Sequence, residues 1–194
     1  MQHVAAHDES DRPQLITALI DAYQGEIFGV AMYERLAGQL SDPWQRWQWE
    51  CLAQLEREVR DDLAVLLDRL GCRVSADPAE VVAGVAEADR ILWDDWPKML
   101  DAFIADVPPL IDRYAAILDF SDVEANLHDA HAVVERLVEH EVAAVAFHRG
   151  EMAGASPEES ICEVVGLLRG PLPAPPRHSS TQASRDLTTQ QIVN

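Results

Sequence analysis

Apolar residues recur every three or four positions along most of this 194-residue chain, and this repeat constrains its fold more than any other feature. Such spacing places apolar side chains on one face of an α-helix, whereas a half-buried β-strand requires strict alternation. We find no convincing alternation. The sequence therefore predicts an all-α protein whose helices turn their apolar stripes toward a common core. A chain of this length fits one domain with a sizeable core.

Capping and turn residues predict where the first helices begin and end. The first helix is expected over residues 14–39. The pair Asp42-Pro43 should open the second, because aspartate caps helix N-termini and proline fits the first turn. Gly71 should end it. Residues 73–95 then form a long connection with a short helix over residues 78–88.

Prolines mark the later helices. A third helix is expected from near Pro97, and Pro108-Pro109 should break or kink it, because proline removes a backbone donor and clashes one turn back. The capping-box pattern Ser121-Asp122-Val123-Glu124 opens a fourth helix that runs to about Ala153. Residues 157–168 should form a short closing helix.

The whole chain divides into three parts. Residues 1–13 form a flexible N-terminus, residues 14–170 a helical body, and residues 171–194 a tail rich in Pro, Ser, Thr and Gln that should be disordered. The body has two helical pairs joined by a long crossover between helices two and three. That order predicts a four-helix bundle with a crossover, as in ferritin-like proteins.

Charge excludes several classes of partner. The chain has 34 acidic and 15 basic residues, for a net charge of −19, and Lys98 is its only lysine. Such a surface repels nucleic acid phosphates and anionic lipid, so neither is expected as a partner. We also find no signal peptide, no apolar run near the roughly 18 residues of a membrane span, and three cysteines without a CxxC pair. These features predict a soluble, cytoplasmic protein with reduced thiols.

Three glutamates interrupt the apolar stripes: Glu26, Glu56 and Glu141. Burying a carboxylate without a partner costs several kcal/mol, so such a group binds a cation or keeps its proton. Inward glutamates from several helices are the means by which di-iron bundles hold metal. For Glu56 the alternative is a structural ion pair with Arg60, one helical turn further on.

The segment from Glu26 to Tyr33 has the pattern E-x6-Y, and the segments ending in Glu56 and Glu141 are similar to metal-bearing helices. On these motifs the chain resembles the ferritin-like superfamily of di-iron carboxylate bundles over about residues 14–154. The resemblance implies metal ligation by Glu26, Glu56 and Glu141, iron or manganese at up to two ions per chain, and catalytic roles for Tyr33 and Tyr114.

The family's two ligand histidines are missing at the expected positions. Where the family has E-x-x-H, this chain has Glu56-x-x-Val59 on the second helix and Glu141-x-x-Ala144 on the fourth. On the third helix, Val107 stands where the family has a glutamate. The pattern therefore leaves three carboxylates and no imidazole at the expected places.

Other residues offer replacement ligands. His148 shares a stripe with Glu141 but lies about 10 Å further along the axis, so it would serve a displaced metal site. Asp106 either turns inward beside the proline pair or caps the resumed helix. His140 is expected to face solvent, and His131 and His148 have an alternative interpretation as core histidines. His140 and His148 also resemble the two-histidine helix of heme-oxygenase-like di-iron oxidases, although the residue midway between them is acidic there.

Two functions of different classes follow. The first is a non-heme iron oxidoreductase in which the buried glutamates hold iron that activates O2 toward a small molecule. The second is a metal-free ferritin-like binding module, because a fold does not carry a function by itself. The missing histidines favour the second function, and the retained glutamates favour the first.

Two surface features suggest protein partners. Trp44, Trp47 and Cys51 form a second apolar edge on the second helix, which either packs against the crossover or forms a homodimer contact. The tail segment 185–192 resembles the docking peptide of ferritin-like encapsulin cargo, with an ordinary disordered tail as the alternative.

Overall fold

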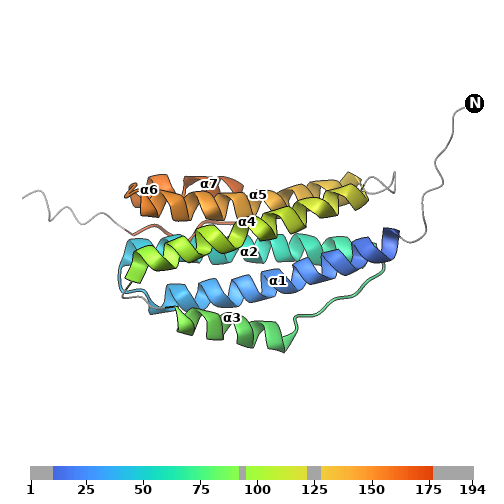
Figure 1. Cartoon of the computed structure of the whole chain (residues 1–194), viewed down its shortest axis with the longest axis horizontal. Helices are drawn as coiled ribbons and strands as arrows, with labels where there is room; N and C mark the ends of the chain where they lie inside the picture. The colour runs from blue at the N-terminus through green and yellow to red at the C-terminus, as the bar shows by residue number, and fades with distance from the viewer. Residues whose placement is uncertain (1–10, 92–94, 122–127, 177–194) are drawn as a thin grey trace, which may run out of the picture.

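The computed structural model describes residues 11–91, 95–121 and 128–176, and this part of the chain is helical with no β-strand (Figure 1). The all-α prediction is therefore confirmed. The helices are α1 (Asp11–Gln39), α2 (Pro43–Arg69), α3 (Pro78–Arg90), α4 (Trp96–Ser121), α5 (His128–Met152), α6 (Pro157–Ser160) and α7 (Cys162–Leu167).

The predicted caps of α2 are present. The Asp42 carboxylate accepts hydrogen bonds from the backbone N–H groups of Trp44 and Gln45, and Pro43 occupies the first turn. After α2, Gly71 adopts a φ of +83°, a conformation that glycine reaches without steric cost. The capping pattern predicted at Ser121–Glu124 falls largely outside the described residues.

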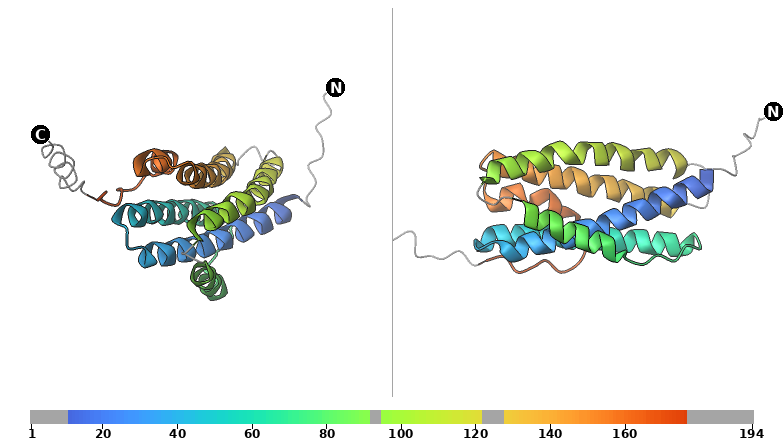
Figure 2. Two further views of the ribbon diagram at one scale, coloured as in Figure 1. Left: turned by 60° about the vertical axis from the view of Figure 1, so that its left-hand side comes forward. Right: turned by 60° about the horizontal axis from the view of Figure 1, so that its bottom comes forward.

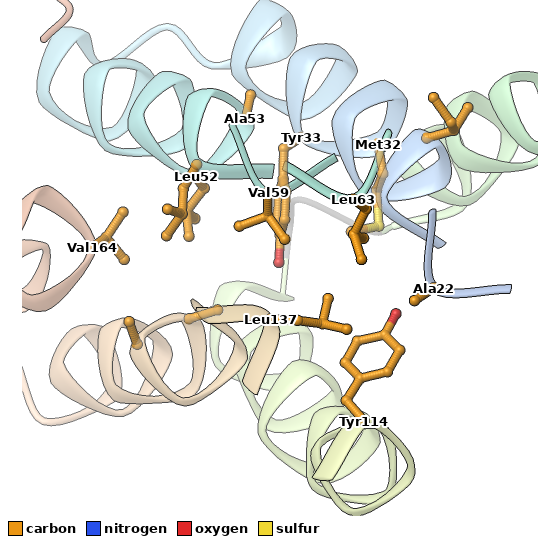
Figure 3. Close-up of a cluster of buried hydrophobic side chains, with 14 of the residues drawn as sticks. Ala22, Met32, Tyr33, Leu52, Ala53, Val59, Leu63, Tyr114, Leu137 and Val164 are labelled. Atoms are coloured by element: carbon orange, nitrogen blue, oxygen red, sulfur yellow. The ribbon is translucent and has the colours of Figure 1, made fainter. Parts of the chain in front are cut away.

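The four long helices α1, α2, α4 and α5 lie side by side, with α3 along the outer face of α1 (Figures 1 and 2). α1 packs on α2, and α4 packs on α5, while contacts of α2 with α5 and of α1 with α4 join the two pairs. α4 begins at the same end of the molecule as α2. Figure 3 shows core side chains between the pairs, among them Val59, Leu137 and the two tyrosines Tyr33 and Tyr114.

α4 runs without a break through Pro108 and Pro109, so of the two predicted outcomes the break is wrong and the kink stays a prediction. The two prolines remove the N–H groups that would bond the carbonyls of Ile104 and Ala105. Ala105 and Pro109 are exposed, and a carbonyl on a solvent-facing side of a helix can be hydrated. Because the helix does not stop, Asp106 is neither a cap nor turned inward: it is exposed in the middle of α4.

The segment after α7 is extended and lies against α2. Trp47 Nε1 donates a hydrogen bond to the carbonyl of Pro173 at 2.8 Å, and the Glu58 carboxylate accepts from the N–H groups of Arg169 and Gly170, each at 2.9 Å. The prediction that Trp47 packs on the crossover is therefore wrong, because this segment covers it. The tail prediction is also wrong at its start, since residues 171–176 contact the body through Trp47 and Gln54. The proposed docking segment 185–192 lies outside the described residues.

α1 departs from one expectation. Residues Arg12–Gln39 are long and apolar enough to cross a membrane by length and composition, with a mean hydropathy of 1.2 in the best window. Half of that window is buried in the protein, and the core helix of a soluble protein passes the same test. α1 packs against α2, α3 and α4, which accounts for its apolar character.

Candidate metal centre

The three predicted glutamates meet in the interior. Glu26 comes from α1, Glu56 from α2 and Glu141 from α5, with exposed fractions of 1%, 6% and 6%. They surround the Nε2 atom of His140, which lies 3.3 Å from Glu26 Oε2, 3.7 Å from Glu56 Oε1 and 3.6 Å from Glu141 Oε1. One ligand atom each from Glu26, Glu56 and His140 lies within 4.8 Å of the others, which is close enough to share one metal ion.

The prediction that His140 faces solvent is wrong, because its ring is 1% exposed. Its Nδ1 lies 2.6 Å from the backbone carbonyl of Leu137, one turn back on α5. A carbonyl only accepts hydrogen bonds, so in the neutral ring Nδ1 carries the proton and Nε2 presents a lone pair. A ligand histidine commonly donates its second ring N–H to a backbone carbonyl in this way.

The atoms around His140 Nε2 are all acceptors when the carboxylates are ionised. Neither His140 Nε2 nor Glu26 Oε2 has a hydrogen-bond partner within the described residues, although both are buried. Four acceptors that face one another without a donor repel, so cations or added protons must lie among them. The donor set of carboxylate oxygens and one imidazole fits iron or manganese.

Burial controls the ionisation of these groups. It raises the pKa of Glu26 well above its ordinary value, and the charges of Glu56 and Glu141 raise it further. Burial also raises the pKa of Glu141 and brings that of Glu56 to about 7. It lowers the pKa of His140 to about 4. A hydrogen bond between the Glu26 and Glu56 carboxyls raises the first pKa and lowers the second, so this pair can share a proton.

Two glycines of α1 make room for the site. A Cβ at Gly29 would overlap the Glu56 carboxylate, and a Cβ at Gly25 would lie 2.8 Å from the Tyr114 hydroxyl. Neither separation is sterically acceptable. Gly25 and Gly29 are one turn apart and flank Glu26, so any larger residue there would displace a group of the site.

A cavity of about 320 Å³ reaches the three glutamates from the surface between α1, α3 and α4. Both predicted catalytic tyrosines, Tyr33 and Tyr114, line it, and their hydroxyls point into the interior (Figure 3). Both are buried, and burial followed by the nearby carboxylates raises their pKa values, so both hydroxyls stay protonated near neutral pH. The cavity therefore joins solvent, two phenols and the candidate metal ligands.

The structure does not bring His148 to the glutamates. Its ring stacks on Phe103 at a centroid distance of 4.6 Å and also contacts Trp49. Neither ring nitrogen hydrogen-bonds within the described part of the chain, and burial lowers its pKa to about 3. A role for His148 as a ligand of a displaced site stays a prediction. His131 is exposed and lies 3.2 Å from Glu135, so its placement in the core is wrong.

The structural alternative for Glu56 is also wrong, because Arg60 pairs with Asp61 at 2.6 Å instead. The sequence pattern did not reveal His140 because the predicted core stripe of α5 contained only one residue per turn. A buried helix face spans more than 100°, so it takes residues at both +3 and +4. From Leu137 these positions are His140 and Glu141, and counting both would have found the histidine.

No protein-family model matches the chain, and no curated protein or solved structure matches it either.

Proposed function

We propose that this protein is a ferritin-like, metal-binding four-helix bundle that acts as a non-heme iron oxidoreductase, with manganese as the second candidate metal. Glu26, Glu56 and His140 would hold an ion, and Glu141 would complete the site. The observation that carries the proposal is the lone pair of His140 Nε2, directed at three buried carboxylates that offer it no donor.

The arrangement of helices supports the ferritin-like assignment. Two helical pairs, α1 with α2 and α4 with α5, pack on each other, and α3 follows α1 between the end of α2 and the start of α4. That path is the one a long crossover takes in such bundles. His140 stands next to Glu141 rather than three residues after it, so the ligand pattern departs from the family's E-x-x-H.

The protein's own residues account for several needs of such a centre. Three carboxylates stabilise a high positive charge, His140 is held in one tautomer by Leu137, and the cavity admits a small molecule or O2. Bound iron would supply one-electron and O2 chemistry. The Tyr33 and Tyr114 hydroxyls, which line the cavity, would donate hydrogen bonds to a substrate there. The group of three ligand atoms fits one ion, and a second ion would depend on Glu141.

A metal-free binding module is the second candidate. The observation that favours it is the hydrogen bond between the Glu26 and Glu56 carboxyls, since one shared proton removes part of the repulsion without a metal. In that case Glu141 and the Glu26–Glu56 pair each hold a proton, and the cavity binds a ligand without redox chemistry.

Metal content distinguishes the two functions. Protein purified without chelators and then exposed to Fe(II) or Mn(II) should retain at least one ion per chain by elemental analysis. The variant His140→Ala should lose it, and its thermal unfolding should no longer respond to metal. The matched control is His131→Ala, nine residues earlier on α5, where the ring is exposed and the metal content should not change. Retention of no metal by the wild-type protein would reject the oxidoreductase and leave the binding module.

A further inference from the structure

The cavity is larger than a metal site needs, and most of its wall is apolar. Phe28 and Met32 of α1 face Phe103, Val107 and Leu110 of α4 across it. A cavity of about 320 Å³ with mainly apolar walls and a few polar groups has the size and character of a small-molecule site. The remaining lining groups indicate which kind of molecule fits.

Among the described residues that line the cavity, Arg113 is the only basic one. Its guanidinium carbon lies 5.5 Å from the centre of the Tyr114 ring, and within the described residues no carboxylate lies at ion-pair distance from it. Other arginines of the described residues do pair with a carboxylate: Arg35 pairs with Asp89, and Arg136 pairs with Glu58. Arg113 thus stacks on an aromatic ring, and its charge acts on Tyr114 and Glu141 from beyond ion-pair distance. Its guanidinium can therefore still form an ion pair with a bound anion.

Besides the three site glutamates, two acidic residues line the cavity: Glu87 of α3 and Asp106 in the middle of α4. Glu87 is already bound by Arg90 through both carboxylate oxygens. Asp106 stands seven residues before Arg113, about 10 Å along the helix axis. The side of the cavity formed by α4 is therefore basic at the Tyr114 end, apolar in the middle and acidic near Phe103.

We propose that this cavity binds a small organic monocarboxylate with an apolar body. Its acid group would lie on Arg113, and its hydrocarbon would lie between Met32, Val107 and Leu110. The guanidinium can donate two parallel hydrogen bonds to a carboxylate, which a neutral molecule cannot match. Binding of the monocarboxylate is independent of the proposed function. Only its role as the substrate of the oxidoreductase rests on that function.

Calorimetric titration of the full-length protein as purified, with octanoate, 1-octanol and octylamine as probes, tests the inference. Octanoate should bind at least about tenfold more tightly than 1-octanol, because a charge-assisted hydrogen bond adds affinity. Octylamine should bind most weakly of the three. The variant R113Q should remove the preference for octanoate while binding 1-octanol as before. The matched control R73Q, an exposed arginine between α2 and α3 and outside the cavity, should behave as the wild type.

Two further measurements make each failure interpretable. The variant L110W fills the apolar middle of the cavity and should weaken all three probes, so octanoate binding that survives it would lie elsewhere and overturn the inference. Equal binding of octanoate by R113Q and wild type, or a preference for octylamine, would overturn it as well. R113Q should keep the wild-type metal content. Failure of the metal proposal would instead appear in the elemental analysis, whatever the probes do.

Discussion

His140 donates through Nδ1 to the backbone of its own helix, which leaves Nε2 as an acceptor among three carboxylates. This one hydrogen bond determines the chemistry of the site, because it prevents the ring from acting as a donor to Glu26 without taking up a second proton. Burial opposes that protonation and lowers the pKa of His140 to about 4. At neutral pH the site therefore needs a cation or protonated glutamates.

At the same scale, Gly29→Ala should weaken metal binding by at least about tenfold, because the new methyl group would occupy the position of the Glu56 carboxylate. Elemental analysis at limiting metal concentration, or competition with a chelator, measures the change. The matched control is Gly38→Ala on the same helix, where a Cβ meets nothing within 4 Å. Gly38→Ala should leave metal binding unchanged and stabilise the protein by up to about 1 kcal/mol through helix propensity. Equal metal binding by both variants would contradict the assignment of Glu56 as a ligand.

At the scale of elements, the long helices differ in how they carry the site. α1, α2 and α5 supply the candidate ligands, whereas α4 forms part of the cavity wall and supplies none of these ligands from its described residues. α4 also contains two prolines in a continuous helix, and it forfeits two backbone hydrogen bonds there. Its stability must come from packing against α5 and α1.

Pro109→Ala should therefore stabilise the protein by about 1–2 kcal/mol, because it restores an N–H donor for the carbonyl of Ala105 in a helix that already exists. The gain is smaller than the full cost of an interior proline, since proline also restricts the unfolded chain. Urea denaturation measures it. Pro157→Ala is the matched control: Pro157 occupies the first turn of α6, where no bond is lost, so the change should not stabilise. A loss of stability in Pro109→Ala would mean that α4 requires a bend at this point.

At the scale of the whole molecule, three raised carboxyl pKa values link folding to pH. The folded protein retains protons on Glu26, Glu56 and Glu141 at pH values where the unfolded chain has released them. The free energy of unfolding must then fall as pH rises, until the folded pKa is passed. His140 and His148 act in the opposite sense, because their lowered pKa values destabilise the fold as pH falls below about 6.5. Between about pH 6.5 and 8 the carboxyls set the trend, because the raised pKa values of Cys51, Tyr33 and Tyr114 act only near and above the ordinary pKa values of a thiol and a phenol.

The melting temperature of chelator-treated protein should therefore fall between about pH 6.5 and 8.5. The slope in the free energy of unfolding should reach up to about 1.4 kcal/mol per pH unit for each carboxyl that still holds its proton in the fold. Added Fe(II) or Mn(II) should reverse the trend, because metal binds the ionised carboxylates and replaces their protons. Scanning calorimetry with and without metal measures both. A melting temperature that is constant over this range in the chelated protein would mean that the glutamates are already ionised in the fold.

The sequence alone determined the helices and three of the four groups at the centre. Periodicity, the Asp42-Pro43 start and Gly71 predict local structure because their effects act within a few residues. Glu26, Glu56 and Glu141 were visible because each is a charge in an otherwise apolar stripe. No such local contrast marks His140, Arg113 or the path of α4 through its prolines.

Tertiary structure decided those features. His140 and Glu141 are adjacent in sequence and lie at one centre only because α2 packs on α5 and the Glu26 side chain of α1 reaches the same point. Residues 171–176 are predicted to be disordered by composition, but Trp47 and Gln54 of α2 form hydrogen bonds with their backbone. The cavity arises between α1 and the consecutive helices α3 and α4, which the whole of α2 separates from α1 along the chain. In each case the energy comes from contacts between distant segments, and a local pattern does not contain them.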